Sequence, residues 1–417
     1  MPGKASATSP RRPVTAAISV TAVAGSGEGN NGGVERGGGF LDGDALIARL
    51  SSPIGIAKGL DGSLLIIDRD NHRVRKLHRN IDHQWTTLIT IAGGPASGLE
   101  DSAVGTMARF LDPTSCALDT RRTGRLLLAD CANRVIRSVD TGGGAVTTIA
   151  GTGEPGRTDG GLEVASFRQP YGIACSSADG TIFVSDDHRI REISPTGDVS
   201  TLAGSFQGFA DGKGACSAFN RPLGIAVSPD GLALFVADCE NHCVRRVDRA
   251  GNVMTVAGDG APGFEQGLAR TAKFYEPTAV AVDSDGVIYV ADYRNARVRR
   301  IEPAERKGSY CDDAVVSVVA TVWGPLGLYL DEQCGQLYVT TAAHRVLAIP
   351  VPSLSARRAA RVYPVLRTWA LVQRGRAVQN DSKMGDLQHQ KSLPVVVRLL
   401  SCPVEHVLGR VLNYAFE

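Results

Sequence analysis

The chain has 417 residues, a formal net charge of +2, 48 glycines, 20 prolines and 6% aromatic residues. This length is sufficient for a large buried core, and the lack of any apolar run of about 18 residues excludes a membrane-spanning helix. Nine cysteines without dense spacing argue against a disulfide-rich secreted scaffold, so we expect reduced thiols and an intracellular, cytoplasmic protein, with organellar targeting left open.

The two ends of the chain differ in charge from its middle. Residues 1–17 contain Lys4, Arg11 and Arg12 but no acidic residue and no apolar signal region, so we predict a flexible basic tail. Residues 351–417 carry a net charge of +6, which leaves −7 for residues 18–350. A nucleic-acid-binding domain is expected to carry positive charge on its own surface, so this distribution disfavours RNA as a partner.

The first predicted strand, residues 18–25, resembles the last strand of a repeated unit that is best seen in residues 219–258. In that unit Pro222 opens an apolar run, Asp230 and Gly231 mark a tight turn, and a second run ends at Asp238 before two further short strands. The opening proline recurs at Pro53, Pro113, Pro170, Pro222, Pro277 and Pro325. Six four-stranded units predict an all-β fold, a six-bladed β-propeller.

The end of the second strand carries the same polar residues in most units. We interpret them as structural positions, because a carboxylate there can accept turn N–H groups or bind an arginine of the third strand, and asparagine suits a tight turn. These positions are Asp68, Asp130, Asp186, Asp238, Asp292, Asn71, Asn133, Asn241 and Asn295. The third-strand arginines are expected in ion pairs between blades or at the surface, and the sixth copy, Thr340–Val346, has lost the acid and the amide.

The sixth unit has three predicted strands and no fourth. We therefore predict that the N-terminal strand completes the last blade and closes the ring, which removes a free sheet edge. The predicted domains are a flexible tail at 1–17, the propeller at 18–350 and a basic, partly helical extension at 351–417.

The repeated pattern resembles the NHL repeat family. The residues that carry this resemblance are Pro-x-Gly-Ile-Ala-Val at 222–227, Asp-Gly at 230–231, Tyr-Val-Ala-Asp at 289–292 and Asn-x-Arg-Val at 71–74 and 295–298. The resemblance covers about 18–350. It implies a propeller fold and, from some members of the family, binding of protein or RNA on one face. Similar six-bladed propellers also include metal-dependent lyases and lactonases, which use non-equivalent acids and histidines around the channel.

Long glycine-rich stretches join the fourth strand of each unit to the proline of the next. Most end in a phenylalanine three residues before that proline, and we expect Phe110, Phe167, Phe219 and Phe274 to pack between neighbouring blades. The junction from Val318 to Pro325 lacks such a stretch, so the ring should be uneven there. The acids within these stretches are candidate partner contacts: Asp42, Asp101, Asp159 and Asp211.

The repeat stops after Pro352. Residues 403–416 have apolar side chains at helical spacing, with proline at the start, which predicts a terminal amphipathic helix. This helix either packs on the propeller or docks a partner. We take Leu408 on this helix and Trp369 earlier in the extension as further candidate contacts.

Motifs that carry chemistry in other proteins are better explained here by the repeat. Gly151–Gly156 and Gly258–Gly263 match G-x-G-x-x-G, but each contains proline and no helix follows. Cys239 and Cys243 have zinc-ligand spacing but lack a second pair. Four of the eight histidines share one repeat position: His72, His188, His242 and His344. The sequence predicts no catalytic residue, no cofactor and no metal ion.

Three classes of function remain. The favoured one is a non-enzymatic scaffold, in which the propeller is an interaction module for a protein partner. The alternatives are a metal-dependent propeller lyase or hydrolase and an RNA-binding propeller. The oligomeric state is left open.

Overall fold

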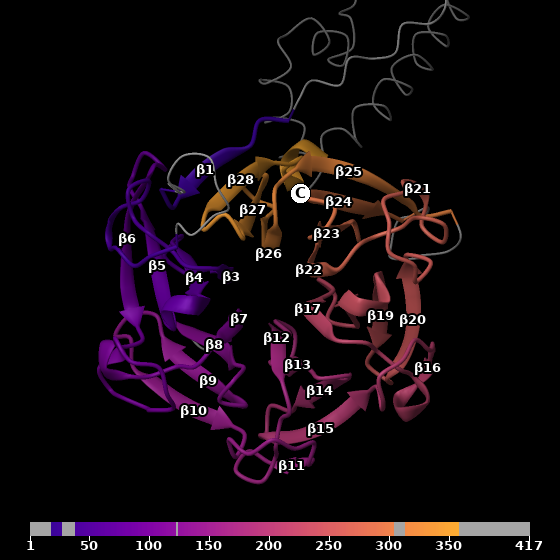
Figure 1. The fold of residues 1–417 in the computed structure, drawn as a ribbon, viewed down its shortest axis with the longest axis horizontal. Helices are drawn as coiled ribbons and strands as arrows, with labels where there is room; N and C mark the ends of the chain where they lie inside the picture. The colour runs from indigo at the N-terminus through magenta and orange to yellow at the C-terminus, as the bar shows by residue number, and fades with distance from the viewer. Residues whose placement is uncertain (1–17, 27–37, 122–123, 304–312, 358–417) are drawn as a thin grey trace, which may run out of the picture. The chain divides into compact units, whose positions relative to one another are not determined.

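The computed structural model describes residues 18–26, 38–121, 124–303 and 313–357. The chain divides into two compact units, the larger of which comprises residues up to 331 together with 336–350. Within the described part of this larger unit, six antiparallel sheets are arranged in a ring (Figure 1), and their innermost strands line a central channel. The prediction of an all-β, six-bladed propeller is confirmed.

Blades 1 to 3 follow one another along the chain, and in each blade the second to fourth strands lie progressively farther from the innermost one. Blade 1 comprises β3 (Pro53–Lys58), β4 (Leu64–Asp68), β5 (Arg73–Arg79), β6 (Trp85–Ala92) and β2 (Gly43–Asp44). Blade 2 comprises β7 (Pro113–Asp119), β8 (Arg125–Asp130), β9 (Val135–Asp140) and β10 (Val146–Ala150). Blade 3 comprises β12 (Pro170–Cys175), β13 (Ile182–Asp186), β14 (Arg189–Ile193), β15 (Asp198–Ala203) and β11 (Gly160–Gly161).

Blades 4 to 6 complete the ring with the same order of strands from the channel outward. Blade 4 comprises β17 (Pro222–Val227), β18 (Ala233–Asp238), β19 (Cys243–Asp248), β20 (Asn252–Ala257) and β16 (Gly212–Lys213). Blade 5 comprises β22 (Pro277–Val282), β23 (Ile288–Asp292), β24 (Arg297–Glu302), β25 (Val315–Thr321) and β21 (Gly267–Leu268). Blade 6 comprises β26 (Pro325–Asp331), β27 (Gln336–Thr341), β28 (Val346–Pro350) and β1 (Thr21–Ala24).

The N-terminal strand closes the ring. β1 pairs antiparallel with β28, with Thr21 opposite Ala348 and Ala22 opposite Leu347, and the innermost strand β26 of blade 6 lies against β3 of blade 1 (Figure 1). Val23 and Ala24 are buried in a cluster with Tyr338 and Val346. The predicted closure by the first strand is therefore confirmed.

A short outer segment, which we call the strap, crosses the outermost strand of each of blades 1 to 5. The sequence predicted these stretches as loops, but in four blades part of the strap forms a fifth strand, and in blade 2 it forms an isolated bridge between Ser102 and Val146. The strap begins beside the repeated turn and ends at the residue that packs between two blades. It covers a strand edge that would otherwise be open.

The hydrophobic core is divided among the junctions between blades. Phe110, for example, is fully buried among side chains of blades 1 and 2, and Phe219 among side chains of blades 3 and 4. Phe167 and Phe274 occupy the equivalent places, as does Leu50 between blades 6 and 1. Such burial of aromatic and aliphatic side chains stabilises the contact between neighbouring blades.

The smaller unit includes residues 332–335 and the residues from 351 onward. Residues 354–357 are helical, the Leu354 N–H donates to the Glu332 carbonyl at 2.8 Å, and Arg357 pairs with Glu332 at 2.7 Å. The predicted tail at 1–17 and the predicted helix at 403–416 lie outside the described residues. Of the helices in the described part, none has the length and apolar character that a bilayer crossing requires.

Candidate interaction face and central channel

The acid that ends the second strand is fully buried in blades 1 to 5 and binds three groups. In blade 4, Oδ1 of Asp238 accepts the Asn220 N–H at 2.8 Å, and its Oδ2 accepts Nδ2 of Asn241 at 2.8 Å and Nη1 of Arg245 at 2.7 Å. The same three bonds recur at Asp68, Asp130 and Asp292. Blade 3 has a shorter turn without asparagine, and there Asp186 accepts a second backbone N–H instead.

Burial governs the protonation of these acids. It raises the pKa of Asp130 and of Asp238 to about 6, although the arginine and asparagine partners lower it. For the same reason the pKa of Asp68, Asp186 and Asp292 is raised. The paired arginines are Arg75, Arg137, Arg191, Arg245 and Arg299. All five are fully buried within their own blade, so the prediction of ion pairs between blades or at the surface is wrong for them.

The acids proposed as partner contacts anchor the straps. Oδ1 of Asp211 accepts Nη2 of Arg245 at 2.7 Å, and its Oδ2 accepts the Thr255 N–H at 3.1 Å. Asp42, Asp101 and Asp159 make the same pair of contacts in blades 1 to 3. Each carboxylate thus ties its strap to the buried arginine and to the outermost strand. These side chains stay about half exposed, and their contact with a partner stays a prediction.

The four repeated histidines join neighbouring blades. Nδ1 of His344 accepts the Ser52 N–H at 2.9 Å, and Nδ1 of His72 accepts the Asp112 N–H at 3.2 Å. His188 and His242 accept equivalent N–H groups of blades 4 and 5 at 3.2 and 3.3 Å. The repeat position indicated a structural role, but the sequence did not show that the acceptor reaches across the blade junction.

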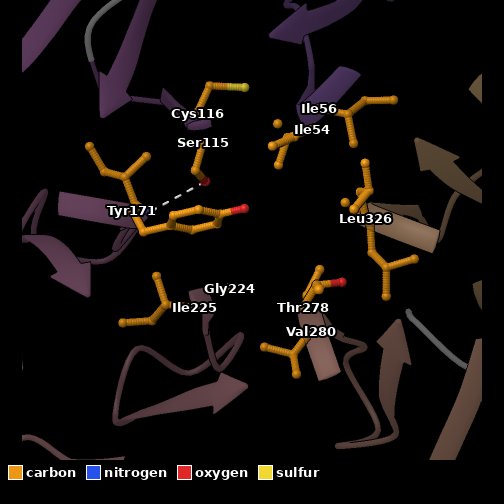
Figure 2. A pocket seen from close by; sticks show the side chains of 15 residues that line it. Ile54, Ile56, Ser115, Cys116, Tyr171, Gly224, Ile225, Thr278, Val280 and Leu326 are labelled. Carbon is orange, nitrogen blue, oxygen red and sulfur yellow. Dashed lines mark hydrogen bonds between the residues drawn. The ribbon is translucent and has the colours of Figure 1, made fainter. Parts of the chain in front are cut away.

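The central channel is lined by the innermost strands of all six blades (Figure 2). Its walls are mostly aliphatic, and Tyr171 lies across the opening, where a cavity of about 70 Å³ remains. Burial raises the pKa of Tyr171 to about 12 and raises the pKa of the Cys116 thiol still further above its ordinary value. Both groups are therefore uncharged at neutral pH. In ranges 18–26, 38–121, 124–303 and 313–357, no group of three His, Cys, Asp or Glu side chains has metal-binding geometry.

One face of the propeller presents apolar side chains at equivalent places in four blades. They are Phe40, Leu99, Phe209 and Phe264, each 46% to 49% exposed, and we call them the apolar ring. Each follows a glycine whose carbonyl accepts the amide of the repeat asparagine, as in the 2.8 Å bond from Asn241 to Gly208. The buried turn therefore fixes the position of each exposed side chain.

Neighbouring members of this face are in contact with the adjacent strap. Phe209 lies over Arg245 at 5.1 Å and comes within 3.2 Å of the position that a side chain on Gly260 would occupy. In blade 3 the equivalent residue is Arg157, which pairs with Asp187. At the junction of blades 5 and 6, Trp323 is 60% exposed. Sequence reasoning missed this face, although Phe40, Leu99 and Phe209 each lie two positions before a strap acid that had been singled out.

Two candidate contacts, Trp369 and Leu408, lie outside the described residues. The glycine-rich segments 151–156 and 258–263 begin straps and open no helix, which agrees with the repeat explanation. The exposed apolar ring and the channel are thus the two candidate sites in the described part of the chain.

A sequence profile of the NHL repeat matches residues 219–247 and 274–301. These segments contain the first three strands of blades 4 and 5, and the other blades repeat their pairing and most of their polar contacts. The chain is a six-bladed propeller that contains NHL repeats. This bears out the resemblance seen in the sequence.

The NHL-repeat propeller is similar to parts of larger curated proteins. It is 27% identical over 281 residues to Suppressor of quenching 1, a chloroplastic protein of Arabidopsis thaliana, covering 63% of this chain and 26% of that protein. It is also 27% identical over 299 residues to NHL repeat-containing protein 2 of Gallus gallus, covering 63% of this chain and 40% of that protein. The chain thus spans less than half the length of these relatives.

Solved structures share the fold at low sequence identity. A protein of unknown function from Bacteroides thetaiotaomicron superposes with a TM-score of 0.58 at 16% identity, over 79% of this chain and 75% of that one. A gluconolactonase from Xanthomonas campestris superposes with a TM-score of 0.51 at 14% identity, over 73% of this chain and 87% of that one. At such identities the likeness concerns the fold alone.

Proposed function

We propose that this NHL-repeat propeller is a non-enzymatic scaffold that binds a protein partner on the face carrying the apolar ring. The observation that carries the proposal is the half exposure of three phenylalanines and a leucine at equivalent places on one face. Exposed aromatic residues are enriched at protein-binding surfaces, and they often dominate the binding energy. Trp323 adds a large exposed aromatic at the junction of blades 5 and 6.

The chemistry of the channel favours this scaffold over a metal-dependent lyase or hydrolase. Such an enzyme needs acids or histidines that converge on the channel, whereas the side chains that line it here are aliphatic or carry a hydroxyl, phenol or thiol. RNA binding is also less favoured, because the repeated arginines with the most conspicuous pattern are buried in ion pairs and cannot reach phosphates.

We also propose an intracellular location. Seven cysteines in the described residues are free thiols, as expected for a reducing compartment. The name of one relative places that relative in the chloroplast, so an organellar location of this chain is the alternative to the cytoplasm.

The test compares the full chain with a variant carrying Phe209→Ser, Phe264→Ser and Trp323→Ser in affinity purification from an extract with and without RNase treatment. We expect the variant to lose the proteins that the native chain retains. The matched control carries Leu60→Ser, Ile81→Ser and Leu232→Ser, three exposed apolar residues in turns at the ends of other strands. This control should retain the same proteins.

Three results would contradict the proposal. Equal recovery by both variants would remove the apolar ring from the interface. Recovery that RNase abolishes would favour RNA, and a stoichiometric metal ion in the purified chain would favour the enzyme.

A further inference from the structure

The outer edge of blade 6 differs from that of the other blades. In each of blades 1 to 5, one strap residue pairs with an aliphatic residue of the outermost strand, and that aliphatic side chain is at most 4% exposed. The aliphatic residues are Leu88, Val146, Val199, Val253 and Val316. Extending the register of β1 and β28 by one residue beyond Thr21 puts Val20 at this position of blade 6, and Val20 is 36% exposed. Ile18 beside it is 44% exposed.

The side chains that anchor a strap are replaced in blade 6. In blade 4, Arg245 and Thr255 lie opposite each other, and both bind the strap acid Asp211. The same two register positions of blade 6 hold Leu347 and Ala22. Leu347 is partly exposed, whereas the arginine at this position is fully buried in each of blades 1 to 5. The polar anchor for an aspartate has thus become an apolar surface.

The buried acid is replaced as well. Pro325 lies opposite Thr341, as Pro222 lies opposite Asp238, so Thr341 is the counterpart of the buried acid. The sequence had placed Thr340 at this position, and the structure corrects that alignment by one residue. Thr341 Oγ1 donates to the Arg345 carbonyl within its own turn. No carboxylate therefore stands at this position, and Leu347 occupies the place of the arginine that binds it in the other blades.

The chain has no room for its own strap at this place. Val322–Gly324 alone separate β25 from β26, and Val322 is the buried residue three positions before the proline. Among the described residues, none pairs with the outer side of β1. Residues 18–26 contain no charged side chain, and an uncharged edge is one that readily accepts a further strand.

We propose that the edge formed by Ile18, Val20, Ala22 and Leu347 binds an extended segment of a partner protein, which pairs with β1 as an added strand. The five straps show what covers this register elsewhere in the molecule. Because an aspartate here would face leucine and alanine instead of arginine and threonine, the segment carries an aliphatic residue where the chain's own straps carry the acid. This site is separate from the apolar ring, so the two proposals can fail independently.

The experiment uses the full chain and two fluorescent peptides. The first peptide has the sequence of residues 40–49, the strap of blade 1, and the second carries Asp42→Val. We expect the Asp42→Val peptide to bind about tenfold more tightly by fluorescence anisotropy, since burying an unpaired carboxylate is unfavourable. Hydrogen exchange of the Val20 and Ala22 amides, which face the outer edge, should slow when this peptide is added.

Two variants test the location and the chemistry. Val20→Lys should abolish binding, whereas Met254→Lys, an exposed position on the outermost strand of blade 4, should leave it unchanged. Leu347→Arg together with Ala22→Thr restores the polar anchor, and this double variant should reverse the preference in favour of the peptide with Asp42. The reversal cannot result from misfolding, because it requires a gain of binding.

Other outcomes overturn the proposal. Binding that is absent, equal for the two peptides or insensitive to Val20→Lys would exclude this edge as the site. Amides of Val20 and Ala22 that are already slow to exchange in the isolated chain would show that its own residues cover the edge. A dimer in sedimentation that Val20→Lys dissociates would assign the edge to a second copy.

Discussion

At the residue scale, the cluster of Asp238, Asn241 and Arg245 is a buried ion pair in which both charges have further hydrogen-bonding partners. Arg245 donates to the Ala218 and Ala210 carbonyls as well as to two carboxylates. A buried pair of this kind contributes little net stability compared with apolar residues, but removing one partner is costly because the other charge is left behind. The cluster therefore fixes the turn and the strap more than it drives folding.

Arg245→Met tests this cluster. We expect the variant to lose about 3 kcal/mol of unfolding free energy near pH 8, where Asp238 would be a buried anion without its cation. The pKa of Asp238 is about 6 in the folded chain, above about 3.9 in an unfolded one. The folded state therefore binds the proton more tightly, and loss of Arg245, which lowers this pKa, raises it further. Protonation of Asp238 then removes the unpaired charge, so the loss should shrink as the pH falls from 8 to 5.

Urea unfolding at pH 5, 6, 7 and 8 measures this dependence. Arg246→Met is the matched control, because Arg246 is the next residue of the same strand and is partly exposed. Its effect should be small at every pH. A loss for Arg245→Met that does not change with pH would contradict the proposed coupling to Asp238.

At the scale of elements, the strap joins three parts of a blade. Its acid binds the arginine of the third strand and a threonine of the outermost strand, and its glycine carbonyl accepts the asparagine of the turn. Blade 5 departs from this scheme, because Gln266 replaces the acid and Val318 replaces the threonine. Burial there lowers the pKa of Arg299, although Asp292 raises it.

Gln266→Asp combined with Val318→Thr should complete the strap of blade 5. A half-exposed carboxylate bound to a buried guanidinium and a backbone N–H is expected to add about 1 kcal/mol to the unfolding free energy. Thermal and urea unfolding would show the gain. Gln266→Asn with Val318→Thr keeps the shape without the charge and should gain less; an equal gain would contradict the role of the second carboxylate.

The strands, the six units and the closure could be predicted from the sequence because they depend on local periodicity and on the repeat. Pro222 and Asp238, for example, are the two ends of a single hairpin of adjacent strands. The strap's role could not, because the contact between Asp211 and Arg245 spans 34 residues and depends on how the strap crosses the sheet. The apolar ring was missed for a related reason: nothing in the sequence around Phe209 distinguishes an exposed phenylalanine from the buried Phe219.

At the scale of the whole molecule, the blades are held together by the phenylalanine junctions, the innermost strands and the histidine bonds. The histidines link blades 1 to 2, 3 to 4, 4 to 5 and 6 to 1. Blade 2 has Arg134 and blade 5 has Ala296 at the left-handed backbone position that His72, His242 and His344 occupy in their blades. The histidine bond is thus an addition to the junction and not a requirement for it.

His72→Ala should lower the unfolding free energy by about 1 kcal/mol, since the Asp112 N–H loses a neutral acceptor at a partly buried junction. Arg134→Ala is the matched control. It also introduces alanine at a left-handed backbone position, but the Arg134 side chain accepts no N–H of the next blade. Its effect should be smaller. Equal losses in urea unfolding would assign the cost to the left-handed backbone and not to the hydrogen bond.

Closure of the ring depends on one short strand, and two N-terminal truncations separate it from the tail. Removal of residues 1–17 leaves β1 intact and should change neither the unfolding midpoint nor the sedimentation coefficient. Removal of residues 1–24 also deletes the buried Val23 and Ala24 and exposes the edge of β28, so we expect a loss of about 3 kcal/mol or more together with self-association through the open edge. A monomeric chain of native stability after the longer truncation would mean that the inner strands alone keep the ring closed. A clear loss of stability after the shorter truncation would place the domain boundary before residue 18.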